Sequence, residues 1–144
     1  MTHKIDLLRA WLSYNKPSII TLSETWLNSE ISDADVKLDG YTLYRADRAT
    51  RGGGVATYIS SHLSSELIMP KERAFHFECL FVNIAFHETK RITIGNIYRP
   101  PNSPFESTNC ILATISYLDY ANLLILMGDF NRNWLDCSSS HEKK

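Results

Sequence analysis

The sequence predicts an α/β domain, and the prediction depends on three segments. Residues 123–127 are five apolar residues in a row, which is typical of a strand buried on both faces. Residues 3–15 have the apolar spacing of an amphipathic helix, and the β-branched run at 18–22 that follows is typical of a strand. A second helical pattern, residues 104–120, leads directly into the strand at 123–127. Two helices that each lead into a strand fit an α/β domain with helices packed on a sheet.

The composition is that of one globular domain or part of one. The chain has 144 residues, of which 44% are hydrophobic and 22% charged, so it can bury one core but not two. Fifteen Lys and Arg residues oppose 16 Asp and Glu residues, which leaves a net charge of −1. A surface that binds DNA must therefore be a local patch.

The cysteines and the lengths of the apolar runs indicate the cellular compartment. Cys79, Cys110 and Cys137 lie too far apart for a Cys-x-x-Cys metal site, and their odd number leaves one unpaired in any disulfide scheme. Such usage fits a reducing compartment. No apolar run approaches the roughly 18 residues of a membrane span, and the first residues lack a secretion signal. We therefore expect an intracellular chain, nuclear or cytoplasmic, with no membrane partner.

The first half of the chain places a carboxylate at the end of a strand and three glycines in a turn. The helix at 3–15 should end near Pro17, and the strand at 18–22 leads to Glu24. Strands at 41–45 and 55–60 flank a charged corner that ends in three consecutive glycines. These glycines lack the spacing of a P-loop, so a flexible hairpin turn is favoured over a phosphate cradle.

Basic residues gather near this turn and at a later strand end. Arg45, Arg48 and Arg51 place three guanidinium groups close together, which suits phosphate contacts, although a solvated loop explains them equally well. Strands at 78–86 and 91–98 read as a hairpin whose second strand ends at Tyr98 and Arg99, followed by two prolines that stop further pairing. The helix at 104–120 begins after these prolines.

The strand at 123–127 ends in Gly128-Asp129-Phe130-Asn131. A carboxylate at such a strand end can hold a hard cation, and a neighbouring amide can orient a phosphate oxygen. Asp129 and Glu24 would form a magnesium site if the two strand ends are adjacent in space, because Mg²⁺ needs only one or two protein carboxylates. The alternative is that Asp129 and Asn131 form an Asx-type turn after a core strand.

Four motifs in this order resemble the endonuclease/exonuclease/phosphatase superfamily, and more narrowly the apurinic-type endonuclease domain of non-LTR (LINE-type) retrotransposons. The motifs are Leu22-Ser23-Glu24-Thr25-Trp26-Leu27, Tyr44-Arg45-Ala46-Asp47-Arg48 with Arg51-Gly52-Gly53-Gly54-Val55-Ala56, Ile97-Tyr98-Arg99-Pro100-Pro101-Asn102, and Gly128-Asp129-Phe130-Asn131. The likeness covers nearly the whole chain. It implies two β-sheets packed face to face, helices outside them, and Mg²⁺-dependent cleavage of phosphodiester bonds in DNA, with Mn²⁺ as an alternative metal.

The resemblance also implies a role for each matched residue. Glu24 would be the metal ligand, and Asp129 would orient or deprotonate the attacking water. Asn131 would bind the scissile phosphate, and Tyr98 would contact the phosphate side of the site. Arg99 joins the three arginines of the turn as an expected phosphate contact.

Two parts of the family pattern are missing from the sequence. The family begins with a strand that carries an asparagine before the first helix, and it ends with a Ser-Asp-His segment that acts in catalysis. We therefore expect residues 1–136 to be a partial domain with its C-terminal portion missing, residues 137–144 to be a disordered polar tail, and His141 not to replace the missing histidine. The strand at 123–127 would then expose an apolar edge and face.

Three functions follow from these observations. The first is a retrotransposon endonuclease that nicks target DNA, with a reverse transcriptase domain in the parent reading frame. The second is a non-catalytic remnant or a weak nucleic-acid-binding fragment, which the missing Ser-Asp-His segment favours. The third is a phosphatase of the same superfamily. No oligomer is indicated.

Overall fold

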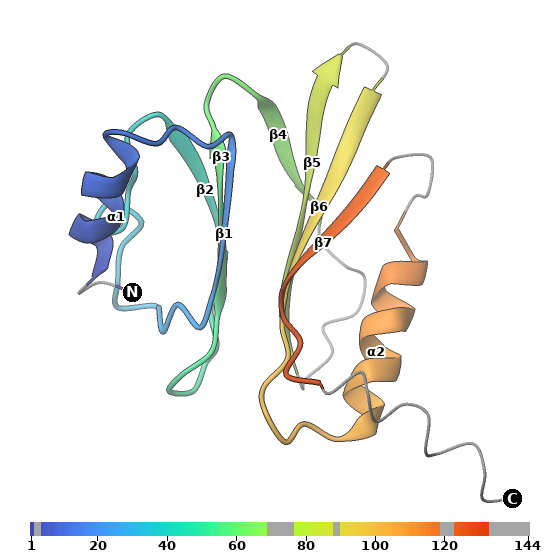
Figure 1. Ribbon diagram of the computed structural model, residues 1–144. Helices are drawn as coiled ribbons and strands as arrows, with labels where there is room; N and C mark the ends of the chain where they lie inside the picture. Colours follow the sequence, from blue (N-terminus) through green and yellow to red (C-terminus); the bar gives the residue numbers. More distant parts are fainter. Residues whose placement is uncertain (2–3, 69–76, 88–89, 119–122, 133–144) are drawn as a thin grey trace, which may run out of the picture.

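The computed structural model describes residues 1, 4–68, 77–87, 90–118 and 123–132, and it shows two β-sheets packed face to face (Figure 1). Helix α1 lies on the outer side of one sheet and helix α2 on the outer side of the other. This arrangement confirms the expected α/β sandwich with outer helices. The elements are α1 (Ile5–Leu12), β1 (Ile19–Ser23), β2 (Tyr41–Ala46), β3 (Val55–Ser60), β4 (Ser64–Ile68), β5 (Glu78–His87), β6 (Lys90–Tyr98), α2 (Phe105–Ser116) and β7 (Leu123–Asp129).

The first sheet has the order β1-β3-β2, and both of its strand pairs are antiparallel. Because Val55 lies opposite both Ser23 and Ala46, the β2–β3 hairpin loop sits beside the end of β1. The prediction of a hairpin turn at the three glycines is therefore confirmed. On the outer face, α1 and the loop after β1 cover the buried Tyr58, whose hydroxyl donates to the carbonyl of Val36 at 2.7 Å.

The second sheet has the order β4-β5-β6-β7. Strands β5 and β6 form the predicted antiparallel hairpin, whereas β6 and β7 are parallel and are connected through α2. Strand β4 was not predicted, because its sequence Ser-Ser-Glu-Leu-Ile is half polar and at the sheet edge its residues remain partly or fully exposed. The helices are shorter than predicted: α1 ends at Leu12 and α2 at Ser116.

The prediction that the last strand is buried on both faces is wrong for this chain. Strand β7 is an edge strand, and Leu123, Ile125 and Leu126 are 62%, 38% and 37% exposed. The continuous apolar run places apolar side chains on both faces of β7. The described residues partly bury only some of these side chains. The expectation that β7 would expose an apolar edge is confirmed.

Asn96 joins the two sheets inside their interface. It lies on β6, is fully buried, and its amide nitrogen donates to the carbonyl oxygens of Leu22 (3.1 Å) and Ala56 (2.9 Å) and to the hydroxyl of Thr57 (3.2 Å). Leu22 lies two residues before Glu24, and Asn96 two residues before Tyr98. The amide therefore ties together the two strands that carry these site residues.

Asn96→Leu is expected to lower the free energy of unfolding by about 1–3 kcal/mol, because the substitution removes these hydrogen bonds and leaves buried acceptors without them. Urea denaturation measures the change as a lower midpoint at unchanged slope. The matched control is Asn15→Leu, because Asn15 is exposed and its amide donates only to the carbonyl of Trp11. Equal effects of the two substitutions would contradict this role of Asn96.

Several expectations concern residues outside the described ranges. The polar tail at 137–144, which includes Cys137 and His141, lies outside the described residues, so the expectations about it stay predictions. Cys79 and Cys110 are described and are free thiols. Among the helices described, none is long and apolar enough to cross a membrane.

Candidate active site

Three strand ends that carry polar residues meet at one end of the molecule, between the two sheets (Figure 1). They are the ends of β1, β6 and β7, which lie at the bottom of the view. The hydroxyl of Tyr98, at the end of β6, donates to Oε1 of Glu24 at 2.5 Å. Asp129 is the parallel partner of Tyr98 in the β6–β7 register. The fold thus brings Glu24, Tyr98 and Asp129 together, although Glu24 and Tyr98 are 74 residues apart in sequence.

Glu24 sits on a strained backbone that the hairpin loop holds in place. Its φ is +53° and that of Trp26 is +56°, a region that residues other than glycine rarely adopt. The amides of Thr25 and Trp26 donate to the carbonyls of Gly54 (3.2 Å) and Gly53 (2.9 Å). Backbone strain of this kind persists only when neighbouring structure enforces it, and it is often found at functional sites.

The end of β7 forms the Asx-type turn that the sequence left open as an alternative. The backbone amide of Asn131 donates to Oδ1 of Asp129 at 3.0 Å. The side-chain amide of Asn131 donates to the carbonyl of Arg99 at 3.0 Å, and the amide of Arg99 donates to the carbonyl of Asp129 at 2.9 Å. This turn holds Asp129 next to Tyr98, so the turn and the predicted site occupy the same residues.

Tyr98 is a hydrogen-bond donor at neutral pH. Only 4% of its surface is exposed, and burial together with the Glu24 carboxylate raises its pKa to about 12. Asp129 raises the pKa further, whereas the Arg48 guanidinium opposes the rise. Because the phenol keeps its proton, Tyr98 can orient Glu24 by donating a hydrogen bond to it.

The raised pKa of Tyr98 predicts a loss of stability at alkaline pH. In the folded chain the pKa of Tyr98 is about 12, whereas the ordinary pKa of a tyrosine is 10.0, so the stabilisation is complete below pH 10 and is lost as the pH rises toward 12. We expect Tyr98→Phe to flatten this part of the pH dependence of the unfolding free energy, measured in urea. Tyr14, which is 91% exposed, supplies the control Tyr14→Phe. Similar pH curves for wild type and Tyr98→Phe would contradict the assignment.

Arg45 and Arg99, two of the expected phosphate contacts, are occupied by partners within the chain. The Arg45 guanidinium bonds to the carboxylates of Asp47 and Asp33, which raises its pKa. Arg99 is 6% exposed and donates to the carbonyls of Asn131 (3.1 Å) and Ser103 (2.6 Å). Either arginine could contact a phosphate only if it first gave up some of these hydrogen bonds within the chain.

Arg48 and Arg51 lie around the glycine hairpin. Arg48 forms an ion pair with Glu78 at 2.6 Å, and Glu78 is the antiparallel partner of Tyr98 in the β5–β6 register. The second Glu78 oxygen, Oε2, is buried and accepts no hydrogen bond from the residues described. The Arg51 guanidinium lies over the ring of Trp26, 5.8 Å from its centre. Arg48 and Arg51 thus lie at the site end of the sheets, Arg48 in an ion pair with Glu78 and Arg51 over the Trp26 ring.

Sequence reasoning missed Asn96 and Glu78 as residues that shape this site. An amide inside the apolar run of β6 was the available signal for Asn96, because a buried amide must find partners. Glu78 carried no such signal, since a glutamate at the start of a strand is usually exposed.

The site offers oxygen ligands that fit a hard cation. Both Glu24 and Asp129 act on the pKa of Tyr98, so both carboxylates lie within electrostatic reach of one phenol. Among the described residues no group of three or more His, Cys, Asp or Glu side chains could hold a metal ion. One or two carboxylates are the donor set with which Mg²⁺ is usually bound when substrate and water supply the other ligands.

Comparisons with known proteins identify the family and the fold. The model of the Endonuclease/Exonuclease/phosphatase family matches residues 1–136. The endonuclease domain of TRAS1, a telomere-specific non-LTR retrotransposon, superposes with a TM-score of 0.62 at 19% identity, and the match covers 89% of this chain and 54% of that domain. No curated protein matches the chain.

Two further solved structures share the fold. The human Nocturnin catalytic domain with bound sulfate superposes with a TM-score of 0.66 at 12% identity, covering 92% of this chain and 58% of the domain. TDP2 from Caenorhabditis elegans superposes with a TM-score of 0.61 at 12% identity, covering 92% of this chain and 43% of TDP2. The chain thus spans about half the length of the structures it matches.

Proposed function

Because the chain belongs to the Endonuclease/Exonuclease/phosphatase family, we propose that it is part of a metal-dependent endonuclease that cleaves phosphodiester bonds in DNA, of the non-LTR retrotransposon type. The observation that carries the proposal is the hydrogen bond from Tyr98 to Glu24, with Asp129 beside Tyr98 on the next strand. Members of the superfamily generally depend on a divalent metal, which suits these carboxylates.

Each residue of the site has a chemical task in this proposal. Glu24 would hold the Mg²⁺, which when bound neutralises the charge that develops on the phosphate and the leaving oxygen. Tyr98 keeps Glu24 oriented by donating to Oε1. Asp129 would accept a proton from the attacking water, and Asn131 has a second amide N–H with which to donate to a phosphate oxygen.

Two features support the retrotransposon branch. The endonuclease domain of TRAS1, a non-LTR retrotransposon, shares the fold and is 19% identical to the chain. The Tyr98-Arg99-Pro100-Pro101 and Arg-Gly-Gly-Gly stretches also resemble the retroelement enzymes. We extend the proposal to a chromosomal DNA substrate and to a reverse transcriptase domain in the parent reading frame.

The direct test is nicking of supercoiled plasmid by the purified chain, with Mg²⁺, with Mn²⁺ and with EDTA. Nicking that requires the metal is the expected result. Release of phosphate from a soluble phosphomonoester without any nicking would instead favour the phosphatase. DNA binding without either reaction would favour the non-catalytic, nucleic-acid-binding alternative.

Metal binding at Glu24 predicts a shift in stability that does not depend on turnover. A ligand that binds only the folded state raises the free energy of unfolding, by about 2.7 kcal/mol at a hundred times its dissociation constant. We expect millimolar Mg²⁺ to raise the unfolding temperature of the wild type and not of Glu24→Gln. Glu30→Gln should respond like wild type, because Glu30 is exposed and the carboxylates that act on the pKa of Tyr98 are those of Glu24 and Asp129.

A further inference from the structure

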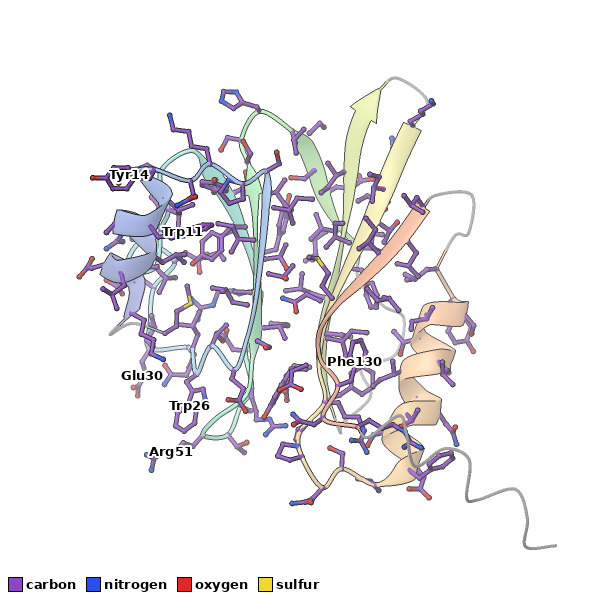
Figure 2. The ribbon with its side chains drawn as sticks, in the orientation of Figure 1. Trp11, Tyr14, Trp26, Glu30, Arg51 and Phe130 are labelled. Carbon is purple, nitrogen blue, oxygen red and sulfur yellow. The ribbon has the colours of Figure 1, made fainter. Side chains whose placement is uncertain are left out.

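Trp26 is an exposed aromatic residue next to the candidate site. It lies two residues after Glu24, and 51% of its surface is exposed. Figure 2 shows Trp26 and Arg51 side by side at the site end of the first sheet, by the β2–β3 hairpin.

The backbone presents this ring in a fixed position. Trp26 has a φ of +56°, and its amide donates to the carbonyl of Gly53 at 2.9 Å. A Cβ built on Gly52 would lie 4.0 Å from two carbon atoms of the indole, so the hairpin packs directly against the ring. The strained conformation and its support show that the exposure of Trp26 is built into the loop, as is common at functional sites.

Arg51 adds a positive charge to the same surface. Its guanidinium lies over the indole ring, 5.8 Å from the ring centre, which is within cation–π range. An aromatic face beside a guanidinium is the combination with which proteins bind single-stranded nucleic acid, since every base has a π-face and every nucleotide a phosphate.

We propose that Trp26, supported by Arg51, is a platform on which a nucleobase next to the scissile phosphate stacks. The proposal rests on the proposed DNA substrate and narrows it to a strand in which a base near the cut can leave the duplex stack. Consecutive Cα atoms are 3.8 Å apart, so the Cα of Trp26 is at most about 7.6 Å from that of Glu24. That span is about two nucleotide steps along one strand.

The test separates base stacking from phosphate attraction by using two fluorescent probes. One is a single-stranded oligothymidylate, and the other is an abasic oligomer with the same sugar-phosphate backbone and no bases. Binding to the full chain is measured by anisotropy in EDTA, so that no cleavage occurs. We expect wild type to prefer the probe with bases, and Trp26→Ala to lose about 5- to 100-fold in affinity for it, with little change for the abasic probe.

Two variants control for structural effects. Trp26→Phe keeps a π-face and should retain most of the affinity. Trp11→Ala removes an indole of similar exposure, 49%, from helix α1, and Figure 2 shows Trp11 well away from the hairpin. Equal affinity of wild type for the two probes would overturn the proposal. So would equal losses in Trp26→Ala and Trp11→Ala, or an equal loss for both probes in Trp26→Ala.

The result of the binding experiment is independent of the nicking assay. Stacking that depends on Trp26 in a chain without metal-dependent nicking would leave the platform standing and reject the endonuclease. Metal-dependent nicking that disappears in Glu24→Gln, combined with unchanged binding in Trp26→Ala, would support the endonuclease and reject the platform.

Discussion

Asp129→Asn is expected to lower metal-dependent DNA nicking by about 10²–10⁴-fold, the range typical for loss of a general acid or base. The substitution removes a negative charge and a proton acceptor but keeps an oxygen at the same place. The side-chain oxygen of an asparagine can still accept the amide of residue 131, which Asp129 accepts at 3.0 Å. The turn at the end of β7 should therefore survive, so that lost activity reports on chemistry and not on folding.

The control for this prediction is another carboxylate far from the site. Asp39→Asn removes one negative charge from a side chain that is 98% exposed, and it should leave nicking at the wild-type rate. Circular dichroism and the unfolding temperature check that Asp129→Asn is folded. Wild-type nicking by Asp129→Asn would exclude the assigned role. Nicking that survives both Asp129→Asn and Glu24→Gln would identify a contaminating nuclease.

Gly128→Ala is expected to destabilise the chain by about 3 kcal/mol or more, since it combines backbone strain with a steric overlap. Gly128 has a φ of +132°, and a Cβ at this position would lie 1.9 Å from the carbonyl oxygen of Ile97. The overlap is with backbone, so the end of β7 must move away from β6. Asp129 is the next residue and would move with it, so nicking should be lost as well.

Gly40→Ala separates the two causes. Gly40 also has a positive φ, +82°, but a Cβ there meets no atom within 4 Å. Gly40→Ala should therefore lower the free energy of unfolding only by the cost of the strained backbone, about 1–3 kcal/mol. Urea denaturation of both variants measures the difference. If the two substitutions destabilise the chain equally, the close approach of β6 and β7 at Gly128 is not the controlling feature.

Most of the elements could be predicted from local patterns. Apolar periodicity and the β-branched runs located both helices and every strand except β4, and the glycines and prolines located the turns between them. These signals succeed because they act within a few residues of each other. Strand β4 carries a half-polar sequence that is stabilised only by pairing with β5, and that pairing is not a local property.

The three arginines near the hairpin turn show what local reasoning leaves undecided. Arg45, Arg48 and Arg51 look alike in the sequence. The folded chain gives Arg45 two carboxylate partners, gives Arg48 the ion pair with Glu78, and leaves Arg51 over Trp26. Which guanidinium groups remain near the site depends on residues up to 30 positions away.

The residues alone were sufficient to predict an α/β domain and to place Glu24, Tyr98, Asp129 and Asn131 at strand ends, because strand formation and strand termination are governed by neighbouring side chains. The sandwich of two sheets was an expectation from the family resemblance. Only the tertiary structure brought these ends together. The register of β6 with β7 sets Tyr98 beside Asp129, and the packing of the two sheets, joined through Asn96, delivers Glu24 to the Tyr98 hydroxyl. Register and sheet packing depend on contacts between distant segments, which no local pattern specifies.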